Sequence, residues 1–197
     1  MAGLVRRAGQ VWQEPFTQGF LLLLVLVTLF LGKPIFSGQP LVAADLLFEL
    51  DPLWQPLAPA GFTAPANPVL SDQVFEFYGW QKFVRTELAQ GRLPLWNPYV
   101  NSGHPFVGNA QSAIFDPFNV VALLWPLAQS FVVVAFLRLL WAGAFALLLA
   151  LALGLSRLAA YLAMIVFTFG GPQIVWLLYP KASALVWLPA VLYFTLR

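Results

Sequence analysis

Hydrophobic and polar positions divide the chain into long apolar runs and one extended polar and aromatic stretch. The apolar runs cover residues 16–36, 131–155, 158–178 and 182–197, whereas residues 37–130 hold every acidic side chain except Glu14. A run of roughly 20 apolar residues is long enough to cross a bilayer as a helix. The pattern predicts an all-α integral membrane protein with about four transmembrane helices and one large external loop.

The basic residues predict an orientation for these spans. Arg6, Arg7, Arg157 and Arg197 fall on one side of the predicted membrane, and Lys181 alone marks the short loop on the other. By the positive-inside rule, residues 1–15 are cytoplasmic and the loop 37–130 is extracytoplasmic. The last apolar run is at the short end of what crosses a bilayer, and we expect a truncated chain.

A cleaved signal peptide is the alternative for the first run, because Val42-Ala43-Ala44 offers small residues at a cleavage site. That site lies well beyond the apolar stretch, across Lys33, Pro34 and Gly38. A retained first helix is therefore favoured.

Composition supports the membrane class and narrows the chemistry. Hydrophobic residues make up 60% of the chain and charged residues only 9%, whereas about a quarter of the residues of a soluble domain are charged. The net charge of +2 is small and the basic residues are scattered, so nucleic-acid binding is not predicted. The apolar runs make membrane lipid the expected partner. The chain has no cysteine, which excludes thiolate catalysis and thiolate metal sites.

Within the external loop, residues 72–90 have the pattern of an amphipathic helix that lies at the membrane interface. Ser71 is suited to cap its start, and Gly91 is placed to end it in a left-handed conformation. A proline-rich segment, residues 56–68, precedes the helix and is expected to be an extended connector.

Residues 91–119 lose helical periodicity and contain turn signals at Asn97-Pro98, Ser102-Gly103 and Asp116-Pro117. Trp96, Tyr99 and Phe106 are able to stack on a sugar or a lipid head group. The amide side chains of this segment either hold backbone groups or contact sugar hydroxyls, and the first use is the commoner one; they are Asn97, Asn101, Asn109, Gln111 and Asn119.

Acidic residues follow the first span closely. Asp45 and Glu49 are spaced to share one helical face, and with Asp51 they offer oxygen ligands of the kind that Mg²⁺ or Mn²⁺ prefers. Solvated surface carboxylates are the alternative. His104, the only histidine, has no second His or Cys to complete a metal site and is interpreted as a turn residue.

Several motifs together resemble the first external loop of bacterial YfhO-like membrane proteins, a family related to the GT-C glycosyltransferases. They are Ser71-Asp72-Gln73, the run 91–99 (Gly-Arg-Leu-Pro-Leu-Trp-Asn-Pro-Tyr), Gly103-His104-Pro105-Phe106, Asn109-Ala110-Gln111 and Phe115-Asp116-Pro117-Phe118-Asn119. The resemblance treats the chain as an N-terminal portion of a longer family member.

The resemblance implies a GT-C-like enzyme that transfers a sugar from a polyprenyl-phosphate donor to an extracytoplasmic acceptor. It places Asp45 at the catalytic centre, with Asp72 as the second choice, because GT-C enzymes carry a catalytic acid soon after the first helix. The departing phosphate is expected to need cations, which Lys82, Arg85, Arg92 and Arg138 could supply. Substrate contacts are expected from these arginines and from the aromatic and amide side chains; the full set is Arg85, Arg92, Trp96, Asn97, Tyr99, Asn109, Gln111 and Arg138.

Arg138 lies inside the second apolar run, where an unpaired charge is costly, so it needs a partner or a phosphate. Snorkelling to the outer interface is the alternative. For the chain as a whole, the alternatives to an enzyme are a non-catalytic membrane protein that binds or helps to move a lipid-linked glycan, and an inactive fragment.

Overall fold

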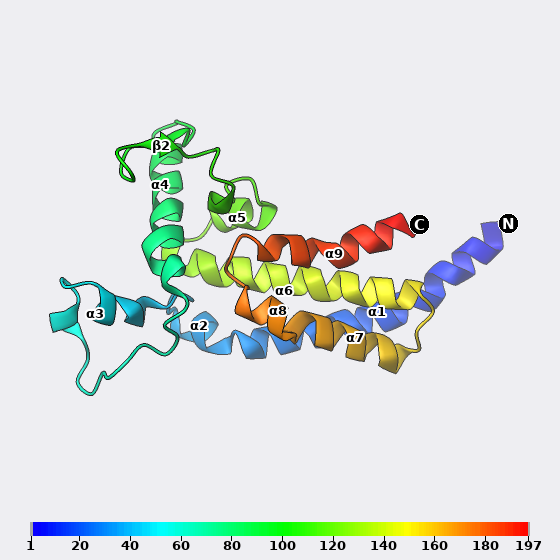
Figure 1. Ribbon diagram of the computed structural model, residues 1–197. Coiled ribbons are helices and arrows are strands. Elements are labelled where there is room, and N and C mark those ends of the chain that lie inside the picture. Colours follow the sequence, from blue (N-terminus) through cyan, green and yellow to red (C-terminus); the bar gives the residue numbers. More distant parts are fainter. Residues whose placement is uncertain (1, 197) are drawn as a thin grey trace. The chain divides into compact units, whose positions relative to one another are not determined.

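In the computed structural model the described residues are 2–196, with side chains described from residue 13 onward, and most of them are helical. The chain divides into two compact units (Figure 1). The first unit comprises Met1–Gly38 and Val132–Arg197, and the second comprises Gln39–Phe131.

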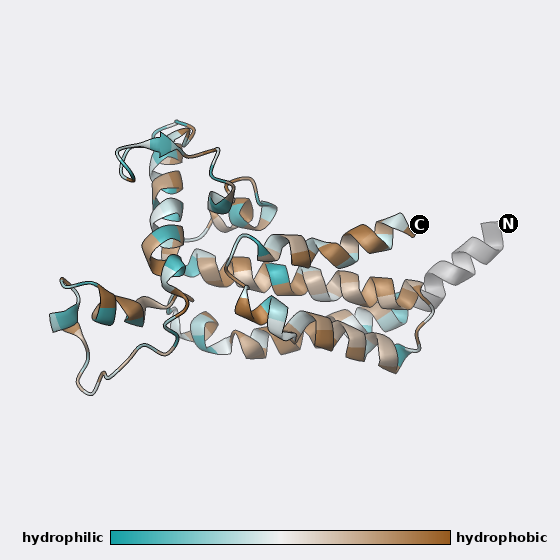
Figure 2. Cartoon of the chain, in the orientation of Figure 1, coloured by the Kyte–Doolittle hydropathy of each residue, from teal (hydrophilic) through white to brown (hydrophobic). Residues whose placement is uncertain are grey.

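The first unit is a bundle of apolar helices. Its elements are α1 (Ala2–Phe30), α2 (Gly32–Ser37), α6 (Leu127–Ala152), α7 (Arg157–Phe169), α8 (Gly171–Val175) and α9 (Ala182–Thr195). The boundary between the units falls inside α6, after Phe131. Figure 2 shows that hydrophobic residues dominate α6, α7 and α9, whereas the second unit mixes both kinds.

Three helical segments are long and apolar enough to cross a membrane: Gln13–Phe30, Leu127–Ala152 and Arg157–Val175. The mostly helical fold with membrane-spanning segments is therefore as predicted. The fourth predicted span, 182–197, corresponds to α9, whose 14 residues give a length of about 21 Å against the roughly 30 Å of a hydrocarbon core. A fourth crossing remains a prediction.

The third predicted span, 158–178, is interrupted. Helix α7 ends at Gly170, whose ψ of 150° is extended, and α8 begins directly after it with Pro172 in its first turn. Proline has no N–H to donate and fits the first turn of a helix, where no intrahelical acceptor exists. The run that looked continuous is thus two helices followed by turns.

Glycine allows α1, α6 and α7 to approach closely. A Cβ on Gly143 of α6 would lie 2.5 Å from Thr168 Oγ1 and 2.6 Å from a Leu23 methyl group. A Cβ on Gly19 of α1 would lie 2.6 Å from Leu147 and 2.7 Å from Tyr161. Small residues at helix contacts permit this packing in membranes, where no hydrophobic driving force separates protein from lipid.

The second unit contains short elements around one long helix. They are a 3₁₀ turn (Ala44–Leu46), α3 (Leu47–Leu50), a second 3₁₀ turn (Gln55–Leu57), a π-helical turn (Gln73–Phe77), α4 (Tyr78–Ala89), β1 (Trp96–Asn97), β2 (His104–Pro105), a 3₁₀ turn (Ala110–Ser112) and α5 (Pro117–Ala122). Strands β1 and β2 are antiparallel, with Trp96 opposite Pro105 and Asn97 opposite His104. The core of this unit contains Phe83, Val84 and Phe106.

The helix expected at residues 72–90 corresponds to the π-helical turn followed by α4. Gly91 follows it with φ of +70°, a left-handed conformation that glycine adopts without steric cost. Ser71 and Asp72 are already helical, ahead of the π-helical turn, and the Asp72 side chain makes no capping hydrogen bond, so the expectation that Ser71 lies outside the helix as its cap is wrong.

Candidate functional site

Asp45 is a half-buried carboxylate in the 3₁₀ turn that opens the second unit. Its Oδ2 accepts a hydrogen bond of 2.7 Å from the backbone N–H of Ala66, which lies in the proline-rich connector. Among the described residues, Oδ1 has no hydrogen-bond partner. The connector therefore fixes the orientation of the carboxylate and leaves one oxygen able to accept a proton.

The two acids that follow Asp45 do not form a metal site with it. Asp51 Oδ1 accepts from Leu53 N at 2.9 Å in a local turn, and Glu49 is exposed. In the part of the chain that the structure describes, no group of three or more His, Cys, Asp or Glu side chains could hold a metal ion. Among the described residues, Asp45, Glu49 and Asp51 therefore do not form the ligand cluster that the hypothesis of a Mg²⁺ or Mn²⁺ site requires.

Asp72, the second acid suggested for catalysis, is exposed at the start of the helix that leads into α4. Desolvation raises the pKa of the neighbouring Glu76, and the negative charge of Asp72 adds to that rise. Asp72 is thus an exposed acid beside a second acid, and the described residues give it no fixed hydrogen-bond donor comparable to Ala66 N–H.

Arg85, expected to contact substrate, binds the end of a neighbouring helix. Its Nη1 donates to the carbonyls of Trp125 at 2.8 Å and Leu123 at 3.1 Å, and its Nη2 donates to Ala122 at 2.9 Å. Burial lowers the pKa of this guanidinium from its usual value. Ala122 is the last residue of α5, and Leu123 and Trp125 follow it, so Arg85 supplies donors to carbonyls at and just beyond the end of this helix.

Arg92 forms a surface ion pair with Glu87 across the end of α4. Nε and Nη2 of Arg92 each donate to one carboxylate oxygen at 2.8 Å, in a bidentate arrangement. The hydrogen bond from Arg92 lowers the pKa of Glu87, and the reciprocal bond raises the pKa of Arg92. The charge of Arg92 is neutralised locally.

Arg138 is the largest fully buried side chain of the first unit, with 1% of its surface exposed. Its Nη1 donates to the carbonyls of Leu177 at 2.9 Å and Tyr179 at 3.2 Å, and its Nη2 donates to Ser183 Oγ at 2.9 Å. The need for a partner predicted from the sequence is met by the turns between α8 and α9. The guanidinium is enclosed by protein groups, and snorkelling to the interface stays an untested alternative.

The aromatic residues predicted to stack on a ligand differ in accessibility. Trp96 and Tyr99 are 55% and 83% exposed, whereas Phe106 is 0% exposed and packs edge to face on Phe83 with centroids 5.0 Å apart. Phe106 is therefore a core residue, and its predicted stacking role is wrong. Asn97 is buried in the same hairpin, where its Oδ1 accepts from Tyr99 N at 3.0 Å.

Most of the amide side chains hold local backbone groups. Asn109 Oδ1 accepts from Gln111 N at 3.0 Å, and Asn119 Nδ2 donates to Ala113 O at 2.9 Å. The Gln111 side chain is exposed. The structure brings Arg92, Trp96 and Tyr99 into one region at the end of α4, whereas Arg138 belongs to the other unit.

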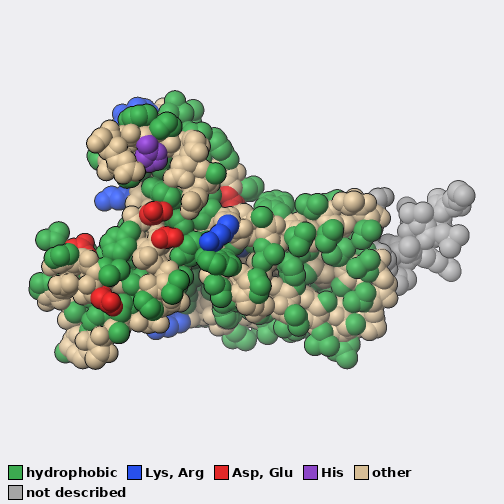
Figure 3. Space-filling view, in the orientation of Figure 1, with side chains coloured by type: hydrophobic (Ala, Val, Ile, Leu, Met, Phe, Trp, Pro, Cys, Tyr) green, Lys and Arg blue, Asp and Glu red, His purple; other side chains and the backbone are tan. Residues whose placement is uncertain are grey.

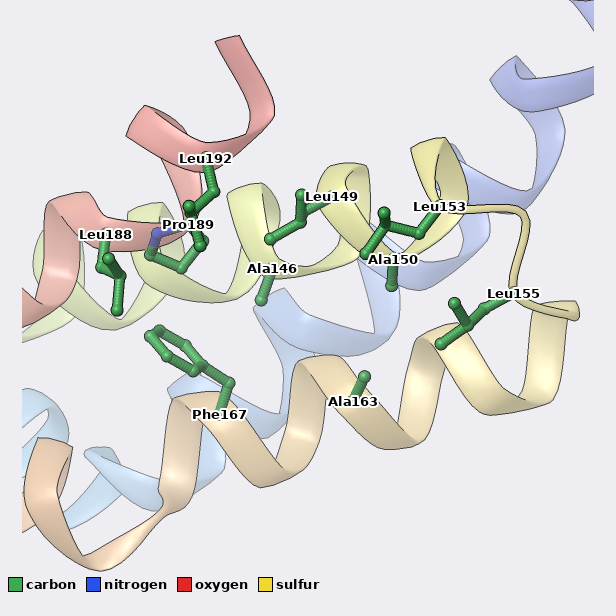
Figure 4. Close-up of a pocket in the computed structure, with 10 residues that line it drawn as sticks. All are labelled: Ala146, Leu149, Ala150, Leu153, Leu155, Ala163, Phe167, Leu188, Pro189 and Leu192. Carbon is green, nitrogen blue, oxygen red and sulfur yellow. The ribbon is translucent and has the colours of Figure 1, made fainter. Parts of the chain in front are cut away.

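An apolar cavity of about 300 Å³ lies within the first unit (Figure 4). It is lined by α6, α7, α9 and the α6–α7 loop through Ala146, Leu149, Ala150, Leu153, Leu155, Ala163, Phe167, Leu188, Pro189 and Leu192. None of these side chains donates or accepts a hydrogen bond, so the cavity matches hydrocarbon and not a reacting centre.

Sequence reasoning missed Gln173, a buried amide in α8 with 2% of its surface exposed. Neither Nε2 nor Oε1 has a hydrogen-bond partner in the described part of the chain. The sequence shows only one glutamine within an apolar run, and this does not indicate whether its side-chain amide is hydrogen-bonded.

Charged side chains gather over the second unit, and the visible face of the bundle is mostly hydrophobic (Figure 3). The chemistry that the chain offers is therefore concentrated in residues 39–131, with Asp45 and the Trp96 hairpin as its two distinct parts. Comparison of the chain with protein-family models, curated proteins and solved structures gave no match.

Proposed function

We propose that this protein is a GT-C-like membrane glycosyltransferase that transfers a sugar from a polyprenyl-phosphate donor to an extracytoplasmic acceptor. The resemblance of residues 71–119 to the external loop of YfhO-like proteins supports the reaction class. The observation that carries the proposal is the Asp45 carboxylate, which is held through one oxygen by Ala66 N–H at 2.7 Å.

In the proposed reaction, Asp45 acts as the general base on an acceptor hydroxyl. The carboxylate takes the hydroxyl proton while the hydroxyl oxygen forms a bond to the anomeric carbon of the donor sugar. The bond from that carbon to the phosphate oxygen breaks, and polyprenyl phosphate leaves with the bonding electrons. A phosphate leaves as an anion, so the reaction needs no strong acid on that side.

Sugar transfer in membranes tests this role. Membranes that contain the protein are supplied with a radiolabelled polyprenyl-phosphate sugar, and label in the acceptor fraction is measured. We expect Asp45→Asn to reduce transfer by about 10²-fold or more at an unchanged protein level, because a general base contributes about 10²–10⁴-fold. Glu76→Gln, an acid of the same unit outside this site, is the control. Equal transfer by Asp45→Asn and the parent would remove Asp45 from catalysis.

The backbone contact offers a second test. Ala66→Pro deletes the N–H that binds Asp45, whereas Ala66→Gly keeps it. We expect lower transfer in the proline variant and nearly normal transfer in the glycine variant. Equal rates in both would show that the connector does not position the carboxylate.

A non-catalytic membrane protein that binds or helps to move a lipid-linked glycan is the second hypothesis. Its supporting observation is that Arg85, Arg92 and Arg138 all bind groups of the protein itself, which leaves the leaving phosphate with few cations. Retention of a radiolabelled lipid-linked sugar without transfer, by both the parent and Asp45→Asn, would favour it.

A further inference from the structure

The apolar cavity of the first unit has a buried floor and an exposed rim. Ala146 and Ala150 of α6 line it and are buried. Leu153, Leu188 and Leu192 also line it, each with at least 44% of its surface exposed. The cavity is therefore a groove that opens onto the medium around the bundle.

Small residues and a proline leave this space between the helices. Ala146 and Ala150 of α6 and Ala163 of α7 each contribute only a methyl group to the lining. Pro189 lies inside α9, where it has no N–H to donate to the carbonyl four residues earlier. Longer side chains at the alanine positions would fill the gap, as they do in a close-packed interior. The residue types of the walls thus account for the groove.

The groove runs along the helices and is narrow. Figure 4 shows its lining residues following α6 from Ala146 to Leu153 and continuing along α7. The rise from Ala146 to Leu153 is about 10 Å at about 1.5 Å per residue. A volume of about 300 Å³ over that length gives a mean cross-section of roughly 30 Å², whereas a helix about 10 Å across needs roughly 80 Å². The groove therefore fits an extended chain and is too narrow to seat a further helix.

The walls and the surroundings determine the chemistry of such a chain. No lining side chain offers a hydrogen bond, so water and polar groups would lose their partners inside. Helices α6 and α7 belong to segments long and apolar enough to cross a membrane, where the medium at the rim is lipid hydrocarbon. Acyl chains run along the membrane normal, as spanning helices do, so chain and groove share one direction. The methyl branches of a polyprenyl chain fit the narrow cross-section less well than an unbranched acyl chain.

We propose that this groove binds one acyl chain of a membrane phospholipid from the leaflet at the α6–α7 loop. Leu153 and Leu155 form the loop end of the groove, so the chain enters there and its methyl end lies beside Ala146 and Phe167. The bound chain fills the space between α9 and the α6–α7 pair and stabilises their packing. Among the described residues no charged side chain lines the groove, so the chain and not the head group is recognised. The inference depends neither on Asp45 nor on sugar transfer.

Photo-crosslinking of the full chain in detergent micelles tests the groove. The protein is titrated with phosphatidylcholine that carries a diazirine on one acyl chain, near its carboxyl end or near its methyl end, and labelled residues are mapped by mass spectrometry. We expect saturable labelling of Leu153 and Leu155 by the first probe, and of Ala146 and Phe167 by the second. Val166 is 70% exposed and lies outside the groove, and labelling of it to the same extent would show ordinary lipid contact and overturn the proposal.

Filling the groove separates it from the surrounding surface. Ala163→Phe places a ring in the groove and should reduce saturable labelling by about tenfold or more, because the ring occupies the space of the chain. Val166→Phe adds the same ring on the outer surface of α7 and should leave the labelling unchanged. Ala150→Phe repeats the test from α6 in case the first variant fails to fold. Labelling of a folded, filled variant at the level of the parent would overturn the proposal.

Competition and thermal unfolding identify the source of the chain. Unlabelled phosphatidylcholine should displace the probe, and polyprenyl phosphate should be about tenfold less effective. Stronger displacement by polyprenyl phosphate would overturn the choice of an acyl chain. Removal of lipid should lower the melting temperature of the parent by about 3–5 °C, and added phosphatidylcholine should restore it. Ala163→Phe should show no such dependence, and an equal dependence in this variant would place the stabilising lipid outside the groove.

Discussion

In each of the two units, an arginine donates hydrogen bonds to backbone carbonyls near the end of a short helix, but the surroundings of the two arginines differ. In the bundle, Arg138 donates to Leu177 O, Tyr179 O and Ser183 Oγ, and in the second unit Arg85 donates to the carbonyls of Ala122, Leu123 and Trp125. In both places the carbonyls lie at or just beyond the end of a short helix, and Ala122 O and Tyr179 O also accept a backbone N–H. A guanidinium can serve several of them together because it presents five N–H groups in one plane.

The difference between the units is the medium around each guanidinium. Arg138 is enclosed in an apolar bundle, whereas Arg85 is half-buried in a unit with polar surface. An unpaired carbonyl in hydrocarbon cannot turn to water, but one near the surface can. A charged residue inside an apolar run is therefore weak evidence for a bound ligand when interrupted helices lie nearby. Replacing such an arginine should also reduce stability more in the bundle than in the second unit.

The largest predicted effect is that of Arg138→Met. Three hydrogen bonds from the guanidinium are lost, to Leu177 O, Tyr179 O and Ser183 Oγ, at a cost of about 1–3 kcal/mol each. Tyr179 O keeps the hydrogen bond from Ala182 N, and the lost buried charge offsets part of the cost. We expect a net loss of about 3 kcal/mol and a lower melting temperature, measured by intrinsic tryptophan fluorescence in detergent. Arg138→Lys keeps the charge with a different donor geometry and should lose less. A melting temperature equal to that of the parent in Arg138→Met would show that the turns between α8 and α9 do not depend on this side chain.

Arg85→Met should have a smaller effect, confined to the second unit. The carbonyls of Ala122, Leu123 and Trp125 lose three hydrogen bonds, but they lie near the surface and Ala122 O keeps the bond from Trp125 N, so we expect a loss of about 1–2 kcal/mol. Hydrogen exchange of peptides covering residues 117–126 should become faster, with no change in α7. Arg92→Met, which removes an arginine of the same unit from a surface ion pair, is the matched control and should leave this exchange unchanged. Faster exchange in both variants would mean that charge, and not the carbonyl contact, matters.

The comparison also predicts a stabilising substitution in the bundle. Gln173 is buried, and within the described residues neither amide atom is paired, so Gln173→Leu removes two unsatisfied polar atoms at similar volume. We expect a gain of about 1 kcal/mol, seen as a higher melting temperature. Gln173→Asn keeps the amide but shortens the side chain, and it should be less stable than the parent. A destabilised leucine variant would indicate that the amide has a partner supplied from outside the described residues.

The sequence predicted the helical elements better than the site. Apolar runs and a polar helix with Gly91 at its end are local signals, and the structure has helices at these positions. Hydropathy does not change at the break between α7 and α8, but Gly170, Gly171 and Pro172 mark its position in the sequence. The partners of Arg85 and Arg138 carry no such mark. Every residue has a carbonyl, so a sequence cannot show which one, about 40 positions away, accepts a hydrogen bond.

The smallest predicted effect is the pH dependence of stability that comes from Glu87 and Glu76, which contribute with opposite signs. The pKa of Glu87 is lowered by Arg92, so the unfolded state binds more protons there and stability is lost as pH falls through the lowered value. The pKa of Glu76 is raised by desolvation and by Asp72, so its contribution is present below pH 4.5 and is lost as pH rises through the raised value. Glu87→Gln should therefore weaken the loss of stability in acid, and Glu76→Gln should deepen it.

Thermal stability of the second unit, measured by hydrogen exchange of α4 between pH 3.5 and 7, tests both signs. Because the Arg92–Glu87 ion pair lies at the surface, 0.5 M salt should shrink the Glu87 effect, whereas the contribution of Arg138 inside the bundle should remain.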